Sequence, residues 1–298
     1  MTKDGRRTIL VTGSTGTVGS EVVKQLASHS LDYGIIKAGV HSTDKTDKLK
    51  GYDSVEIVNL DYRRQETITR ALKNVDKIFL LTLPALDMTD ICSNLIKEAK
   101  KNDVKYIVKL SVMGTNAETE NAVVRLHRQE ERIIEESGIP FSFLRPNAFM
   151  QNFVNYYGRT IKNENAFYLP AGDGKISFVD VRDIAAVAAR VITENGSQHE
   201  NKVYEITGQE ALSFGQAAEI LSKEIGRTIS YVDIPEEDAR KGMKTVGMED
   251  WLIGAIMEAY GGWRAGYASK MTDVVKQITG RKPILFAQFA RDYAEVLR

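Results

Sequence analysis

Short apolar segments alternate with amphipathic segments through the first half of the chain. Apolar runs with the length of buried parallel strands occupy residues 8–11, 34–40, 55–60, 77–82, 105–110 and 141–144. Segments with apolar residues at helical spacing lie between them, over residues 20–30, 65–72, 90–101 and 122–136. Because strands and helices alternate, the pattern predicts an α/β fold with a doubly wound parallel sheet and right-handed crossovers.

A glycine-rich turn separates the first predicted strand from the first predicted helix. Gly13, Gly16 and Gly19 follow one another at a spacing of three. Gly13 permits a sharp turn, Gly16 lets the backbone approach a pyrophosphate, and Gly19 lets the helix pack closely on the sheet. The helix N-terminus then presents unpaired N–H groups to an anion. An ordinary tight turn is the alternative, but the position favours a Rossmann-type dinucleotide site built from Gly13, Ser14, Thr15, Gly16, Thr17, Val18 and Gly19.

The regular alternation ends after Pro146. Helices are predicted over residues 149–161, 184–193, 213–225 and much of the segment after 235, with a terminal helix over 286–297. Short strands are predicted over 176–179 and 202–206. We therefore expect a dinucleotide-binding domain over residues 1–150 and a smaller, mostly helical substrate lobe over 151–298. Parts of about 176–206 are expected to return to the main sheet.

Composition excludes several classes of protein. Lys plus Arg and Asp plus Glu both number 40, so the basic excess typical of nucleic-acid binding is absent. The single cysteine, Cys92, lies on a predicted apolar helix face and suggests a buried spectator in a reducing compartment. No apolar run is long enough to span a membrane, and no cluster has metal-ligand spacing. We expect a cytoplasmic monomer or homodimer that binds a small molecule, with no metal, membrane or nucleic acid.

The end of the second predicted strand bears on the choice of cofactor. Residues 38–42 contain no acidic side chain that would accept from a ribose 2′-hydroxyl. His41, Ser42 and Lys45 offer donors to a 2′-phosphate, which favours NADP. NAD stays possible because no arginine is present and Asp44 lies close by, and His41 is otherwise an exposed loop residue.

Other cofactor contacts are expected where the strands end, because ligands of open parallel sheets bind outside the carboxyl ends. Asp61 follows the third strand and is expected to accept from the adenine amino group or to cap a helix. The path from adenosine to nicotinamide is expected to be lined by Thr82, Leu83 and Ser111.

The acid–base pair of many dinucleotide-dependent reductases is missing. The spacing Tyr-x-x-x-Lys occurs only at Tyr33–Lys37, which falls at the second strand. The helix after the fifth strand offers His127, which is either a general acid near neutral pH or a surface residue in a charged run.

The chain resembles the NmrA-like branch of the atypical short-chain dehydrogenase/reductases. The resemblance rests on residues 11–19, Asp61-Tyr62, Lys109–Val112, Ser137–Pro140, Leu144–Met150, Phe178–Ala185 and Gly280–Pro283 with Phe286–Tyr293. It implies an NAD(P)H-dependent quinone or dye reductase, or a sensor that binds the dinucleotide without turnover. It also implies that residues 146–150, including Asn147, flank the nicotinamide, and that His127 matches a histidine of quinone-reductase-like members. The family's arginine after the second strand is His41 here, and a lysine that some members carry on the helix after the fifth strand is absent.

These observations predict an NAD(P)H-dependent reductase of a flat, apolar electrophile such as a quinone. Such an acceptor takes hydride directly, so no Tyr–Lys pair is required. The pocket is expected to be walled by Asn147, Phe149, Tyr156, Phe167, Trp251 and Trp263, with residues 248–267 as a lid. Simple core packing is the alternative for Trp251. A non-catalytic redox sensor is the alternative function, and a sugar-nucleotide epimerase is disfavoured.

Overall fold

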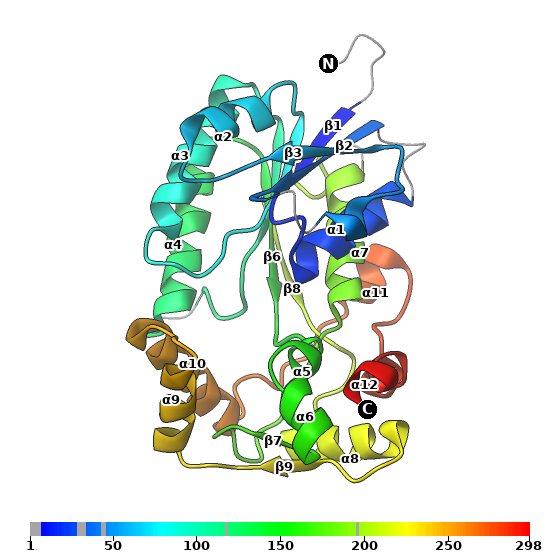
Figure 1. The fold of residues 1–298 in the computed structure, drawn as a ribbon. Coiled ribbons are helices and arrows are strands. Elements are labelled where there is room, and N and C mark those ends of the chain that lie inside the picture. Colours follow the sequence, from blue (N-terminus) through cyan, green and yellow to red (C-terminus); the bar gives the residue numbers. More distant parts are fainter. Residues whose placement is uncertain (1–6, 29–33, 43–45, 117–118, 195–196) are drawn as a thin grey trace. The chain divides into compact units, whose positions relative to one another are not determined.

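The computed structural model describes residues 7–28, 34–42, 46–116, 119–194 and 197–298. Seven strands form one sheet in the order β3-β2-β1-β4-β5-β6-β8 (Figure 1). The pairings of β1 to β6 are parallel. This confirms the predicted doubly wound α/β fold. The strands are β1 (Arg7–Val11), β2 (Gly34–Val40), β3 (Val55–Asn59), β4 (Lys77–Leu80), β5 (Tyr106–Leu110), β6 (Phe141–Pro146) and β8 (Lys202–Ile206).

The chain divides into two compact units. Unit 1 comprises residues 1–117, 126–145 and 184–204, and unit 2 comprises residues 118–125, 146–183 and 205–298. Strand β8 and the helix before it, α7 (Val181–Thr193), therefore belong largely to unit 1. They do so although the chain between β6 and α7 belongs to unit 2. The sequence predicts a single boundary at residue 150, whereas the two compact units each consist of several separate segments of the chain. The domain boundary stays a prediction.

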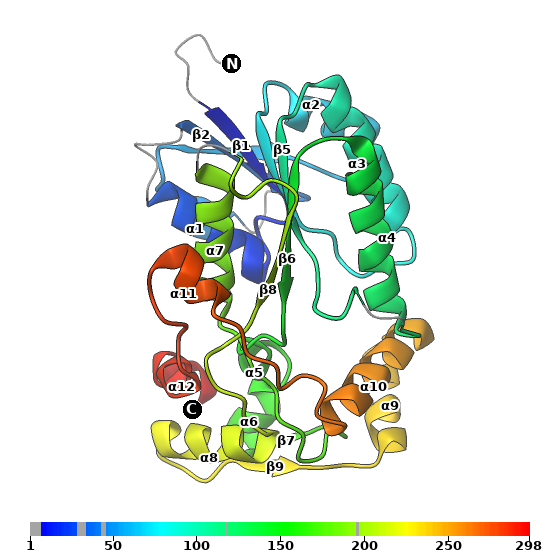
Figure 2. The same ribbon diagram turned by 180° about the vertical axis from the view of Figure 1, so that it is seen from behind.

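Helices cover both faces of the unit 1 sheet because both faces of its strands are apolar. All five residues of β5 are buried. Figures 1 and 2 show the helices packed on the two faces of the sheet. The first face carries α2 (Gln65–Leu72), α3 (Met88–Lys101) and α4 (Ala122–Ser137), and the second carries α1 (Thr17–Ala27) and α7 (Val181–Thr193); a short 3-10 turn, η3, spans Asp47–Leu49.

Unit 2 is mostly helical around an aromatic core. Phe153 packs against the rings of Phe167, Phe178, Phe214 and Phe286, all of them buried. Its helices are α5 (Asn152–Asn155), α6 (Gly158–Glu164), α8 (Phe214–Ile225), α9 (Glu236–Thr245), α10 (Asp250–Arg264), α11 (Val274–Thr279), α12 (Phe286–Asp292) and α13 (Ala294–Leu297).

Unit 2 also contains the largest departures from the predicted elements. A parallel pair, β7 (Ala166–Tyr168) with β9 (Ser230–Val232), was not predicted because each strand has only three residues. The strand predicted over 176–179 is reduced to isolated bridges, Phe149 with Val179 and Ile176 with Leu212. The helix predicted over 149–161 is instead two short helices, α5 and α6. The terminal helix is interrupted at Tyr293, between α12 and α13.

One predicted helix boundary is explained atom by atom. The Ser213 side chain accepts from the Gln216 backbone N–H, and the Gln216 side chain accepts from the Ser213 N–H, which forms a capping box at the start of α8. Gly226 ends the helix with a φ of 84°, a conformation that favours glycine.

Candidate active site at the carboxyl edge of the sheet

The glycine turn follows β1 at the carboxyl edge of the unit 1 sheet. Gly13 has a φ of 62°, in the left-handed region, as the sharp turn requires. A Cβ at Gly19 would lie 2.2 Å from the Gly13 carbonyl oxygen, so only glycine lets α1 pack this closely on the turn. The Gly16 N–H donates to the same carbonyl at 2.9 Å. The turn is therefore a compact unit held by its own backbone.

The hydroxyl side chains of this turn divide into two groups. Ser14 is buried and donates to the Val11 carbonyl oxygen at 2.7 Å, so its hydroxyl holds the loop and does not face a ligand. Thr15, Gly16 and Thr17 are exposed at the start of α1, whereas Val18 and Gly19 are buried. The exposed tip is the part of the turn that can meet a phosphate.

The two residues expected at the adenosine end lie beside each other. The His41 Nε2 atom is 3.8 Å from Asp61 Oδ2, and the His41 side chain is 80% exposed. Asp61 Oδ1 accepts from the Arg63 N–H at 3.0 Å, which fixes the carboxylate in the turn before α2. Ser42 is exposed, and Lys45 and Asp44 lie outside the described residues. The Asp61 carboxylate thus faces the histidine that was expected to favour a 2′-phosphate.

Two residues predicted to line the cofactor path instead direct their hydroxyls into the protein. Thr82 Oγ1 donates to Glu130 Oε2 at 2.9 Å, and Ser111 Oγ donates to Glu131 Oε1 at 2.7 Å. Both residues are almost fully buried, and their place along the cofactor path stays a prediction. Leu83, in contrast, is exposed beyond the end of β4.

The hydroxyls of Thr82 and Ser111 are part of a buried charged cluster that sequence reasoning missed. Lys109 near the end of β5 forms an ion pair with Glu130 of α4, with Nζ and Oε2 2.9 Å apart and both side chains fully buried. Arg145 near the end of β6 pairs with Glu131, with Nη2 and Oε2 2.7 Å apart. The usable signals were a lysine inside an apolar strand and two adjacent acids on the facing helix.

Charge pairing acts on the pKa of the buried Glu130 carboxylate. Burial alone would raise the pKa of Glu130, but Lys109 and the neighbouring His127 outweigh it and lower the pKa below its usual value. Arg145 also donates through Nε to Glu131 Oε1 at 2.9 Å, so its guanidinium holds both carboxylate oxygens. The cluster therefore contains two complete ion pairs beneath the carboxyl ends of β4, β5 and β6.

His127 belongs to this cluster and is not a surface residue. It is 6% exposed, and its Nδ1 atom lies 3.4 Å from Lys109 Nζ and 3.5 Å from Glu130 Oε2. Burial lowers the pKa of His127, the Lys109 charge lowers it further, and the two glutamates oppose the shift only in part. The imidazole is therefore neutral near pH 7, so it can act as an acid only through its single N–H group.

The residues predicted to wall a substrate pocket belong to unit 2, where their surroundings differ. Asn147 is buried, and its amide donates to Ser177 Oγ and to the Ala268 carbonyl oxygen, both at 2.8 Å. Phe167 is fully enclosed in the aromatic core, which corrects its assignment to a pocket wall. Phe149 is half-buried and bridges to Val179.

The other predicted wall residues are closer to the surface of unit 2. Tyr156 is 74% exposed, whereas Trp251 is half-buried and donates to Glu249 Oε2 at 3.1 Å. Trp263 packs against the rings of Phe214 and Tyr260 and so contributes to the core. Asn147, Phe149, Tyr156 and Trp251 stay predictions as ligand contacts.

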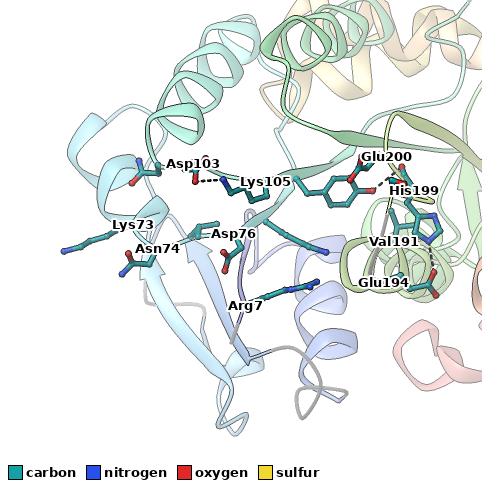
Figure 3. A pocket seen from close by; sticks show the side chains of 15 residues that line it. Arg7, Lys73, Asn74, Asp76, Asp103, Lys105, Val191, Glu194, His199 and Glu200 are labelled. Atoms are coloured by element: carbon teal, nitrogen blue, oxygen red, sulfur yellow. Dashed lines mark hydrogen bonds and ion pairs between the residues drawn. The ribbon is translucent and has the colours of Figure 1, made fainter. Parts of the chain in front are cut away.

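A cavity of about 850 Å³ lies at the opposite, amino edge of the unit 1 sheet (Figure 3). Its lining includes Arg7, Lys77 and Tyr106, where β1, β4 and β5 begin. In Figure 3 the side chains of His199 and Glu194 point toward each other at one end, and His199 Nε2 and Glu194 Oε2 are 2.8 Å apart. This cavity is far from the glycine turn, because the two lie at opposite ends of the same strands.

Three further observations limit the chemistry of the described residues. Cys92 is buried, and burial raises the pKa of its thiol to about 12, which disfavours a nucleophilic role. No helix among the described ranges is long and apolar enough to cross a membrane. Over the same part of the chain, no group of three or more His, Cys, Asp or Glu side chains has the arrangement of a metal site.

Comparisons with known proteins agree with this architecture. The model of the NmrA-like family matches residues 5–261. The chain is 37% identical over 286 residues to an NAD(P)H azoreductase of Xenophilus azovorans, covering 96% of this chain and 98% of that protein. It superposes on the NADPH complex of the quinone oxidoreductase QOR2 from Escherichia coli with a TM-score of 0.83, at 27% identity and covering 95% and 99% of the two chains.

A second solved structure is similar to the same extent. The triphenylmethane reductase of Citrobacter sp. gives a TM-score of 0.83 at 25% identity and covers 97% of this chain and 99% of that one. The family model covers most of the chain, and the azoreductase is similar over almost its full length. The protein belongs to the NmrA-like family.

Proposed function

We propose that this protein is an NAD(P)H-dependent reductase that transfers hydride to a small apolar or aromatic electrophile such as a quinone. The observation that carries the proposal is the packing of the glycine turn, where a Cβ at Gly19 would meet the Gly13 carbonyl oxygen at 2.2 Å. This packing leaves Thr15, Gly16 and Thr17 exposed at the N-terminus of α1, where backbone N–H groups and the helix dipole suit a pyrophosphate. When bound, the reduced nicotinamide supplies the hydride.

The names of the similar proteins support this class of reaction. An azoreductase, a quinone oxidoreductase and a triphenylmethane reductase share electrophilic, conjugated and mostly planar acceptors. Such acceptors take up hydride without prior activation by a strong acid. The acceptor of this chain is therefore proposed to be a conjugated electrophile, with a quinone as the first compound to test.

NADP is the proposed cofactor, and NAD is the second choice. Residues 38–42 contain no carboxylate, and the exposed His41 is available to a 2′-phosphate. Asp61 opposes this preference, because its carboxylate lies 3.8 Å from the histidine ring. Substitution Asp61→Asn would therefore increase the preference for NADPH, because it removes a negative charge beside the place proposed for the 2′-phosphate.

The proposal is tested by following oxidation of NADPH and NADH with a naphthoquinone, an azo dye and a triarylmethane dye. Oxidation with at least one acceptor, faster with NADPH, is the expected result. Tight binding of NADPH without oxidation by any of the three would replace the reductase with the alternative, a dinucleotide sensor. Absence of binding, measured by calorimetry, would exclude both.

A further inference from the structure

Lys109 and His127 lie close enough to exchange a proton, with Nζ and Nδ1 3.4 Å apart. An ammonium group has only donors, so the His127 Nδ1 atom 3.4 Å away can interact with it only as an acceptor. Glu130 Oε2 already accepts from Lys109 at 2.9 Å and from the Thr82 hydroxyl at 2.9 Å. The relay proposed below uses the tautomer with its hydrogen on Nε2, in which Nδ1 is free to accept from Lys109.

Nε2 is the ring nitrogen of His127 that faces away from the Lys109 contact at Nδ1. None of the described residues forms a hydrogen bond with it, and the fully enclosed side-chain atoms without a partner are Glu130 Oε1 and Arg227 Nε. His127 as a whole is 6% exposed. His127 lies in the first half of α4, one turn before Glu130 and Glu131, which accept from Thr82 after β4 and Ser111 after β5.

Burial of the Lys109–Glu130 ion pair beneath His127 costs desolvation free energy. Replacing a fully buried ion pair by apolar side chains of similar size is often neutral or stabilising. Here the Glu130 carboxylate keeps one oxygen, Oε1, without any partner among the described residues. Lys109 itself also donates to Thr82 Oγ1 at 3.2 Å and to the Leu110 carbonyl oxygen at 2.5 Å, so the unpartnered Glu130 oxygen is the part of the pair that stability does not explain.

We propose that Lys109 is the internal proton source for the reduction and acts through His127. This inference rests on the proposed reductase function. Hydride addition to a quinone or an azo group leaves a negative charge on oxygen or nitrogen. The Nε2 proton of His127 passes to that atom while a proton of the Lys109 ammonium passes to Nδ1, so the ring stays neutral and the lysine becomes an amine. One hydride and one proton thus reduce the acceptor by two electrons.

The reverse movement restores the starting state. Nε2 takes a proton from water while Nδ1 returns its proton to the Lys109 amine, so the net proton comes from solvent. Glu130 holds Lys109 in place through their ion pair, with Nζ and Oε2 2.9 Å apart. Lys109 is therefore a positioning residue, because His127 is the group that would touch the acceptor.

Several other polar and titratable groups face this relay. Glu131 is on the same helix, and Arg145 on β6 neutralises it. The charge of Glu130 also influences Tyr62, which follows β3, and Cys92 on α3. Burial raises the pKa of both the Tyr62 hydroxyl and the Cys92 thiol, so neither releases a proton near neutral pH. Neither group therefore competes with Lys109 in the proposed relay.

Two acceptors with different proton requirements test the relay. A quinone needs one hydride and one proton, whereas the cation of malachite green needs only hydride, because addition at its central carbon gives a neutral product. The charge-balanced variant Lys109→Met with Glu130→Gln is compared with wild type, with His127→Gln and with the control Lys105→Met. Lys105 lies at the other end of β5, is exposed, and pairs with Asp103.

The relay predicts a split between the two acceptors. The double variant and His127→Gln should lose about 100-fold or more in kcat with the quinone, the scale of general acid catalysis, and stay within about twofold of wild type with the dye cation. The quinone rate of wild type should also be slower in D2O, whereas the dye rate should not. The control should match wild type with both acceptors.

Each other outcome identifies a different failure. Equal losses with both acceptors would make Lys109 merely structural, and unchanged quinone rates would mean that water protonates the acceptor directly; either result overturns the relay. Wild-type protein that binds NADPH but reduces neither acceptor would overturn the proposed function itself, before any variant is compared. Circular dichroism and NADPH titration of each variant separate loss of folding from loss of proton transfer.

Discussion

The two edges of the unit 1 sheet carry charged side chains in opposite ways. At the carboxyl edge, Lys109 and Glu130 are fully buried and paired with each other. At the amino edge, charged residues surround an open cavity of about 850 Å³ (Figure 3). There, Lys77 donates to the Ile192 carbonyl oxygen at 2.5 Å and lies 5.4 Å from the centre of the Tyr106 ring. The 850 Å³ cavity is thus at the edge opposite the glycine turn, so the position of the cavity and the position of the buried ion pairs point to different edges of the sheet.

The largest expected effect concerns the glycine turn itself. Gly19→Ala places a methyl group 2.2 Å from the Gly13 carbonyl oxygen, so α1 must move away from the turn. A displacement of about 1 Å in a positioning element can cost about 100-fold, and we expect a loss of NADPH affinity of this order. Gly254→Ala in α10 is the matched control, because a Cβ at that position would have no atom within 4 Å. Calorimetry that gives both variants wild-type affinity would remove the glycine turn from the site.

The second prediction compares lysines at the two ends of β5. Lys109→Met leaves Glu130 buried and unpaired, and we expect a loss of about 3–5 kcal/mol in the free energy of unfolding. Lys105→Met removes an exposed ion pair and should cost less than about 1 kcal/mol. Urea denaturation measures both. Adding Glu130→Gln to Lys109→Met should recover most of the loss, and similar stability of the two single variants would contradict the assigned burial.

The third prediction concerns the pH dependence of stability. The pKa of His127 is lowered from its usual 6.5 in the folded protein, so the unfolded chain binds a proton there first as the pH falls. The folded protein should therefore lose stability as the pH falls from about 6.5 towards the folded pKa of His127. The pKa of Glu130 is also lowered, from its usual 4.5, so this group affects the stability of the protein only below about pH 4.5, in a separate pH range. Thermal unfolding of His127→Gln should lack the first of these losses, and an unchanged pH profile would show that the ring is not held neutral.

The smallest effect on activity is expected at the amino edge. Lys77→Met should leave NADPH oxidation within about twofold of wild type, because this edge lies at the opposite end of the strands from the glycine turn. Burial lowers the pKa of Lys77 from 10.5 to about 8, so the unfolded chain binds more protons between those values. Stability should therefore rise with pH in this range, and the variant should lack that contribution. A large loss of activity would give the amino-edge cavity a role in catalysis.

The sequence predicted the parts of the molecule that local rules determine. β2 and β8 and the helix α2 have the predicted bounds, because period and turn residues specify them. Gly13 and Gly19 have the predicted backbone roles, since positive φ and close packing each require glycine. The three-residue strands β7 and β9 were missed because so short a segment has no readable period.

Side-chain direction was the part that the sequence did not reveal. Thr82 and Ser111 were placed correctly at strand ends, but their hydroxyls turn inward because Glu130 and Glu131 lie there as buried acceptors. Phe167 was expected in a pocket and lies in the core, because aromatic residues suit both places equally. His127 was judged by its charged neighbours along the chain, whereas its surroundings come from β5, about twenty residues earlier.

Transfer of deuterium from the cofactor to the acceptor tests the central claim, hydride transfer from bound NAD(P)H, most directly. NADPH carrying deuterium on one face of C4 is incubated with the protein and the malachite green cation, and the product is examined by mass spectrometry. Hydride transfer predicts one deuterium in the product from one face of the cofactor, for wild type and for the charge-balanced Lys109 variant alike. A product without deuterium from either face would contradict it.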